Sequence, residues 1–77
     1  MEELLEYLAR QLVDSPDEVR VERFERDSGE LVLELHVAEA DRGKVIGKGG
    51  RIARSLRTVV KASAVRTGRR VHVEIAA

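Results

Sequence analysis

The chain has no cysteine and no tryptophan, and it contains one tyrosine, one phenylalanine and one proline in 77 residues. Without cysteine no disulfide can stabilise the fold, so one small hydrophobic core must do so. Tyr7 and Phe24 are too few to form an aromatic platform for stacked bases. No apolar run approaches the length of a membrane span, and the acidic residues 2 and 3 are unlike the start of a signal peptide. We therefore expect a cytoplasmic protein that does not contact a membrane.

Charge is divided unevenly along the chain, although the net charge is zero. Residues 1–40 carry four arginines and twelve acidic residues, a net charge of −8, whereas residues 41–70 carry ten basic residues and one acidic residue, a net charge of +9. A charge run is often only a solvated helix face. The near-exclusion of acids from thirty consecutive residues instead predicts an electropositive surface for an anionic partner.

Hydrophobic periodicity predicts six elements. A spacing of three to four residues marks helices, and alternation marks strands. Pro16 and Gly68 supply stop signals for two of the helices. The predicted order is helix 2–13, strand 18–26, strand 31–37, a short helix 38–46 capped near Asp41, a long helix from residue 51 to the stop at 67–68, and strand 71–75.

The connections predict how the strands pair. The tight-turn residues 27–29 imply that the first two strands are antiparallel, and the helical crossover implies that the last strand is parallel to the second. We expect a two-layer α+β domain over residues 1–77, with a three-stranded mixed sheet and three helices on one face. The alternation slips at Glu22 and Arg23, which indicates either a bulge or an edge strand in which Phe24 covers another part of the chain.

A glycine-rich loop joins the short and the long helix. A Walker phosphate loop needs four residues between its glycines and a Ser or Thr after its lysine, and this chain has neither. A dinucleotide-binding fingerprint that began at Gly47 would need glycine at position 52, which is Ile52. A simple glycine-rich turn between helices remains an alternative. The basic surroundings favour a loop whose backbone N–H groups and lysine bind phosphate. The run consists of Val45, Ile46, Gly47, Lys48, Gly49, Gly50, Arg51 and Ile52.

This run resembles the GXXG loop of KH domains, which clamp short single-stranded nucleic acid. The element order α-β-β-α-α-β is similar to the type II KH arrangement over nearly the whole chain. Residues 43–53 are similar to the small bacterial single-KH proteins of the KhpA type. One departure concerns the base groove: KH domains usually have Ile three residues after the last loop glycine, where this chain has Ala53.

The resemblance assigns roles to residues of the loop and its flanks. Lys48 and Gly49 are the variable loop positions along the sugar-phosphate chain. A narrow groove for bases could be lined by Val45, Ile46, Val37 and either Ile52 or Ala53. Packing in the core is the competing interpretation for Ile46 and Ile52. Gly43 either permits close approach of the nucleic acid or is a helix irregularity. The implied RNA-binding residues are Gly43, Lys44, Val45, Ile46, Gly47, Lys48, Gly49, Gly50, Arg51, Ile52 and Arg54.

Nothing in the sequence favours catalysis. His36, His72, Glu34 and Glu74 could gather on one sheet face, but no metal-ligand spacing supports a metal site there, and we expect neither a metal nor a cofactor. The resemblance implies a non-catalytic, chaperone-like RNA-binding protein, with homodimers and a larger Jag-type KH protein as partners. Two alternatives remain: an interaction subunit that pairs through an outward patch including Val32 or through the long helix, and a single-stranded DNA-binding module.

Overall fold

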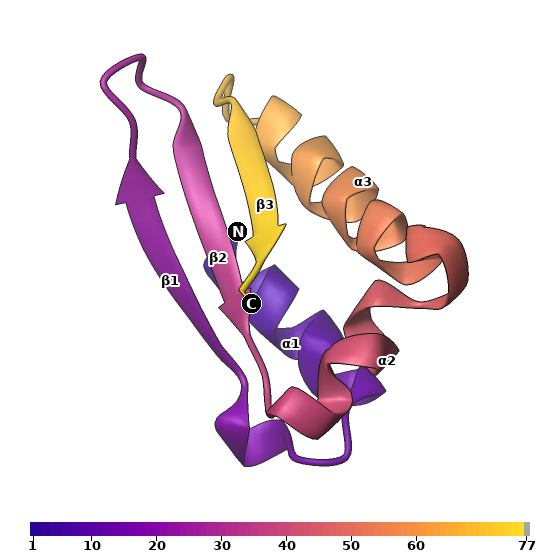
Figure 1. Cartoon of the computed structure of the whole chain (residues 1–77). Coiled ribbons are helices and arrows are strands. Elements are labelled where there is room, and N and C mark those ends of the chain that lie inside the picture. The colour runs from indigo at the N-terminus through magenta and orange to yellow at the C-terminus, as the bar shows by residue number, and fades with distance from the viewer. Residues whose placement is uncertain (77) are drawn as a thin grey trace.

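The computed structural model describes residues 1–76 (Figure 1). Helices and strands follow one another in the predicted order α-β-β-α-α-β, and short 3-10 turns lie at Pro16–Glu18, Glu39–Asp41 and Lys48–Gly50. The elements are α1 (Glu2–Leu12), β1 (Arg20–Glu25), β2 (Leu31–His36), α2 (Arg42–Ile46), α3 (Arg51–Val65) and β3 (Val71–Ile75).

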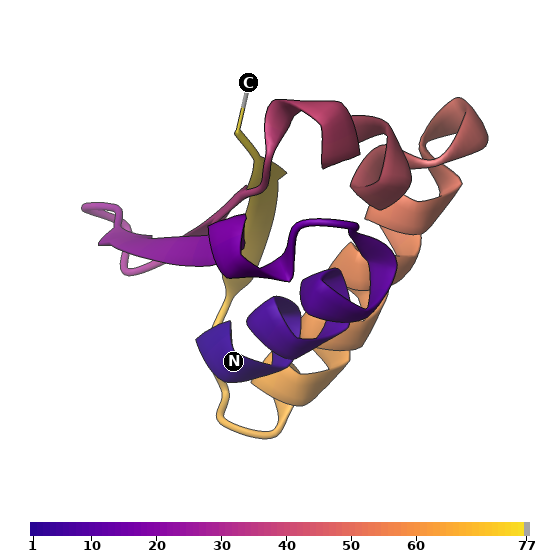
Figure 2. The same ribbon diagram turned by 90° about the horizontal axis from the view of Figure 1, so that it is seen from below.

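The sheet has the predicted topology. Its strand order is β1-β2-β3, with β1 antiparallel and β3 parallel to the central β2. The helices all lie on one side of the sheet, as the view from below makes clear (Figure 2). The predicted two-layer α+β fold is therefore confirmed. Within residues 1–76, no helix is both long enough and apolar enough to cross a membrane.

The irregular first strand is an edge strand without a bulge. Its six residues pair one to one with β2, from Arg20 opposite His36 to Glu25 opposite Leu31. The bulge interpretation is therefore wrong and the edge-strand interpretation is correct. Arg23 occupies a core-side position because the helix layer leaves this edge open, and its guanidinium lies 3.3 Å from a Glu2 carboxylate oxygen.

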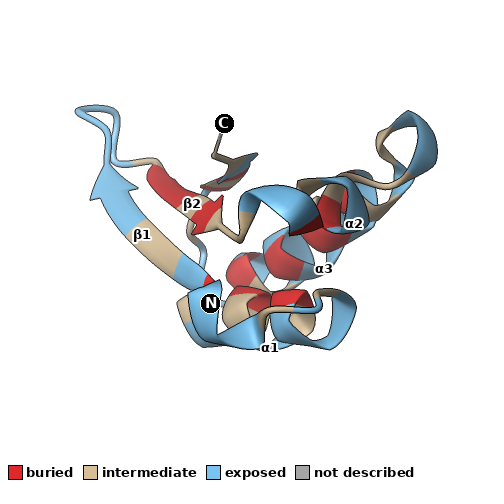
Figure 3. Cartoon of the chain, turned by 60° about the horizontal axis from the view of Figure 1, so that its bottom comes forward, coloured by how far each residue is buried: buried red, intermediate tan, exposed pale blue. Residues whose placement is uncertain are grey.

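One hydrophobic core lies between the two layers. Buried positions line β2 and the facing sides of α1 and α3, whereas β1 is exposed along much of its length (Figure 3). On the open face of the sheet, Val32 is only 6% exposed and itself adds little surface to the outward patch expected for an interaction subunit, whereas Phe24, which pairs with it, is 46% exposed. The core residues are Leu5, Ala9, Val19, Leu31, Leu33, Leu35, Val45, Leu56, Val60, Ala64, Val71 and Val73.

The apolar residues of α3 are not all buried. Ala53, Leu56, Val60 and Ala64 are buried, but Val59 is 45% exposed. The stripe is narrower than its apolar sequence because α1, α2 and β3 cover only one side of this helix.

Asp41 connects segments that are distant in sequence. It lies at the start of α2 as predicted, but its side chain caps no helix N–H. Instead, its carboxylate oxygens accept hydrogen bonds from the backbone N–H groups of Asp14 at 3.2 Å and Ser15 at 3.0 Å. Since Asp41 is 2% exposed, it fixes the chain after α1 against the start of α2.

Replacing Asp41 with alanine should destabilise the fold, because two backbone N–H groups lose a charged acceptor. We expect the free energy of unfolding in urea to fall by about 1.5–3 kcal/mol. Asp14→Ala is the matched control, since it removes only the exposed carboxylate that binds Lys44 and should cost less than about 1 kcal/mol. Equal losses from the two variants would contradict the role given to Asp41.

Candidate nucleic-acid interface

The turn after α2 is built on Gly47. Its φ of 75° and ψ of 171° define a conformation that is nearly exclusive to glycine. A Cβ at this position would lie 2.7 Å from Cγ1 of Ile52, so the side chain of Ile52 packs against the bare α-carbon. The Gly47 N–H also donates to the Gly43 carbonyl at 2.9 Å and closes α2. Backbone conformation and packing therefore both require glycine here.

The rest of the glycine loop, residues 47–50, turns the chain into α3. Gly49 and Gly50 have φ values of 64° and 77°, and Lys48 is the only loop residue with negative φ. Gly50 is the N-cap of α3, where no side chain caps the first turn. The N–H groups of Gly50 and Arg51 donate to the carbonyls of Gly47 and Lys48 within the loop, and no side chain accepts from the N–H groups that follow at the positive end of the α3 dipole, beside Lys48 and Arg51.

Arg54 supports the loop directly. Its Nη1 donates to the Gly49 carbonyl oxygen at 2.8 Å, from one turn inside α3. The guanidinium thus holds the backbone of the loop and adds positive charge beside it. Arg54 is among the RNA-binding residues predicted from the sequence, but its bond to the loop backbone is not.

Lys44 points away from the loop into a different ion pair. Its Nζ donates to an Asp14 carboxylate oxygen at 2.8 Å and lies 3.8 Å from an Asp41 oxygen. The hydrogen bond and charge of Asp14 raise the pKa of Lys44 above its usual value. Of the four cations predicted to contact phosphate, Lys44 is therefore the one already neutralised, whereas Lys48, Arg51 and Arg54 have no carboxylate partner among residues 1–76.

The predicted groove residues divide into buried and half-buried positions. Val45 is fully buried and Ala53 is 4% exposed, so both belong to the core and cannot touch a ligand. Ile46, Ile52 and Val37 are half-buried, and both Ile52 and Val37 pack against the core. Ile46 and Ile52 flank the loop and keep part of their aliphatic surface exposed.

The acidic half of the chain neutralises its own arginines. Arg10, Arg20, Arg23 and Arg26 each lie within 4 Å of a carboxylate oxygen. In residues 41–70 the same holds only for Lys44 and Arg69. Eight cations of this segment lack a carboxylate partner within the described part of the chain, and they surround α2, the glycine loop, α3 and the start of β3: Arg42, Lys48, Arg51, Arg54, Arg57, Lys61, Arg66 and Arg70.

Arg57 is not among the RNA-binding residues predicted from the sequence. Its Nε donates to the Val73 carbonyl oxygen at 3.1 Å, and this bond directs the side chain of an α3 residue across to β3. Arg57 follows Arg54 by three residues and precedes Lys61 by four, so the three share one face of the helix. The sequence spacing alone therefore indicates this cationic row, and the bond to Val73 is what the structure adds.

The open face of the sheet carries the expected histidine and glutamate side chains. Atoms of Glu22, Glu34 and His36 that could ligate a metal lie within 4.8 Å of one another, and the His36 Nε2 is 2.7 Å from a Glu34 oxygen. The guanidinium of Arg20 lies 2.8 Å from Glu22, and this hydrogen bond lowers the pKa of Glu22. Because a cation already occupies Glu22, we assign no metal site here.

A mixed sheet with a helix–glycine loop–helix insertion defines a KH domain of the type II arrangement. The model for the KH domain of KhpA and KhpB matches residues 2–75, and the chain belongs to this family. RNA-binding protein KhpA of Clostridium acetobutylicum is 55% identical over 97% of this chain and 99% of its own length. The KhpA proteins of Treponema pallidum and Bacillus subtilis are 53% and 44% identical, over 96% and 97% of this chain and 91% of each relative.

Among solved structures, Era of Aquifex aeolicus bound to GDP and aluminium fluoride matches with a TM-score of 0.63. The match covers 96% of this chain and 28% of the Era chain at 24% identity, so it supports the fold alone. Another Era structure, determined in complex with nucleotides 1506–1542 of 16S ribosomal RNA, matches equally well.

Gly47 and Gly43 provide a matched pair of tests for the loop geometry. Gly47→Ala should lower the free energy of unfolding by about 1–3 kcal/mol or more, because the methyl group meets Ile52 and φ is positive. Gly43→Ala should raise it by about 0.5–1 kcal/mol, since a Cβ within α2 meets nothing within 4 Å. Urea denaturation measures both changes, and a neutral Gly47→Ala would refute the packing argument.

Proposed function

We propose that this protein binds single-stranded RNA without catalysis, by clamping a short segment along the glycine loop. The observation that carries the proposal is the coincidence of three features in residues 47–51: a turn with positive φ at three glycines, an uncapped start of α3, and two cations without carboxylate partners. Backbone N–H groups and cations together favour phosphate at this point. The naming of the relatives as RNA-binding proteins supports RNA as the ligand. Such binding would take place in the cytoplasm, where bacterial transcripts lie.

The proposed clamp would hold the sugar-phosphate chain against residues 48 and 49 and place bases near Ile46 and Ile52. These contacts are charge, backbone hydrogen bonds and aliphatic packing, because Tyr7 and Phe24 lie elsewhere. Each contact is modest, so a single domain would bind weakly and with limited base preference. That behaviour fits a chaperone-like protein acting on many transcripts.

Replacing Lys48 and Gly49 with aspartate should abolish most RNA binding and leave the fold intact. Both positions are exposed, a Cβ at Gly49 meets nothing within 4 Å, and aspartate tolerates left-handed backbone better than most residues. Filter binding with a single-stranded RNA measures the loss, and circular dichroism checks the fold. Wild-type affinity in the folded variant would overturn the clamp. Competition with a DNA oligomer of matched sequence separates RNA binding from the single-stranded DNA alternative.

A second candidate function is pairing with another copy of this chain, which an exposed apolar surface favours. A hollow of about 350 Å³ between α1 and α3 is lined mainly by aliphatic side chains. Leu12 and Val59 at this hollow are 36% and 45% exposed. We propose that it forms a homodimer contact, and that a larger Jag-type KH protein would use the same surface. The aliphatic residues are Leu8, Leu12, Ile52, Leu56 and Val59.

Val59→Glu should shift the protein to monomer in sedimentation velocity, because a carboxylate would be buried in the contact. Val65→Glu is the matched control, since Val65 is 75% exposed on the same helix but does not line this hollow. A monomeric wild type, or equal behaviour of the two variants, would refute this contact. RNA binding by the clamp is a separate measurement.

A further inference from the structure

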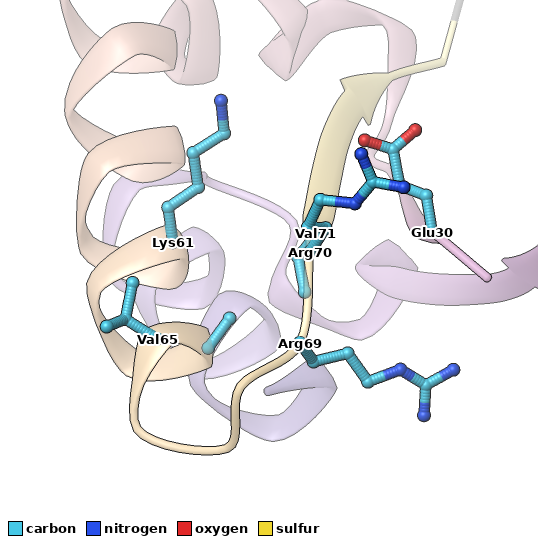
Figure 4. A pocket seen from close by; sticks show the side chains of 7 residues that line it. Glu30, Lys61, Val65, Arg69, Arg70 and Val71 are labelled. Atoms are coloured by element: carbon cyan, nitrogen blue, oxygen red, sulfur yellow. The ribbon is translucent and has the colours of Figure 1, made fainter. Parts of the chain in front are cut away.

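A second hollow lies at the opposite end of α3 from the glycine loop. It has a volume of about 290 Å³ and opens between the last turns of α3 and the start of β3 (Figure 4). Figure 4 shows Lys61 extending from the helix and Arg69 and Arg70 extending from the strand side. The lining residues are Glu30, Lys61, Ala64, Val65, Arg69, Arg70 and Val71.

Two of the charges around this hollow have no carboxylate partner. Arg69 binds Glu25, and Glu30 lies 2.7 Å from Arg26, so these two side chains are neutralised by groups outside the hollow. Lys61 and Arg70 have no such partner among residues 1–76, and the rim is cationic. The floor is aliphatic, because the lining residues Ala64, Val65 and Val71 have hydrocarbon side chains. A cationic rim over an aliphatic floor suits a nucleotide, whose phosphate is anionic and whose base has an apolar face.

A row of cations connects this hollow with the glycine loop. Arg54, Arg57 and Lys61 follow one another at spacings of three and four residues along α3. Arg54 and Lys61 are about 10 Å apart along the helix axis at about 1.5 Å per residue. The bond of Arg57 to the Val73 carbonyl turns the row toward β3, where the hollow opens. An anionic chain held at the loop would therefore meet unneutralised charge all along this seam.

We propose that the hollow is a second RNA subsite, in which Lys61 and Arg70 bind a phosphate and the aliphatic floor receives the adjoining base. The site rests on the proposed RNA clamp and lengthens its footprint beyond the roughly four nucleotides that a KH loop holds. The RNA strand runs from the glycine loop along the seam of α3 and β3 into this hollow.

Oligomer length tests this subsite separately from the clamp. Single-stranded RNAs of four and eight nucleotides are titrated with the wild type, with Lys61→Ser/Arg70→Ser, and with a control, Arg20→Ser/Arg66→Ser, that loses the same charge. Arg66 is exposed near the end of α3, and Arg20 is exposed on the open sheet face; neither lines the hollow. Circular dichroism verifies the fold of all three proteins.

The wild type should bind the longer RNA more tightly than the shorter one. Lys61→Ser/Arg70→Ser should weaken binding of the longer RNA by about fivefold or more and flatten its log–log salt slope by about 0.7, the value for one lost phosphate contact. Binding of the shorter RNA should fall no more than in the control. Equal wild-type affinity for both lengths, or equal losses in the variant and the control, would overturn the subsite. A different result would refute the glycine-loop clamp: the variant with aspartate at positions 48 and 49 would bind the four-nucleotide RNA as tightly as the wild type.

Discussion

The contact between the Ile52 side chain and the bare α-carbon of Gly47 fixes the turn between α2 and α3. Only glycine fits at position 47, where the backbone leaves α2 with positive φ and extended ψ. The chain then enters α3 through Gly49 and Gly50, which are both left-handed. This path leaves no side chain to cap α3. After Arg51, whose N–H donates to the Lys48 carbonyl, the first turn of α3 therefore has no side-chain acceptor for its N–H groups, and the packing of Ile52 on Gly47 is what sets this arrangement.

Ion pairs within residues 1–40 leave most cations of residues 41–70 free to bind an anionic partner. Glutamates pair with each arginine of residues 1–40, so these cations do not compete for a polyanion. Two cations of residues 41–70 do have carboxylate partners. Lys44 anchors α2 to Asp14, and Arg69 connects the start of β3 to β1. A net charge of zero thus coexists with a row of unneutralised cations.

Sequence alone predicted the element order, the sheet topology and the loop, because periodicity and turn residues are local signals. It failed where the outcome depends on contacts between distant segments. The pairing of Lys44 with Asp14 spans 30 residues, and the burial of Val45 and the exposure of Val59 depend on how neighbouring elements cover each helix. Periodicity identifies an apolar face but does not say which part of it another element covers.

The most direct test of the account is an NMR titration of the isotopically labelled protein with a four-nucleotide single-stranded RNA. If the glycine loop and the start of α3 hold the phosphates, the backbone amide signals of Gly47, Lys48, Gly49, Gly50 and Arg51 should move most. Those of Glu22 and Glu34 on the open sheet face should stay in place. Large shifts on the open sheet face without shifts in the loop would contradict the account.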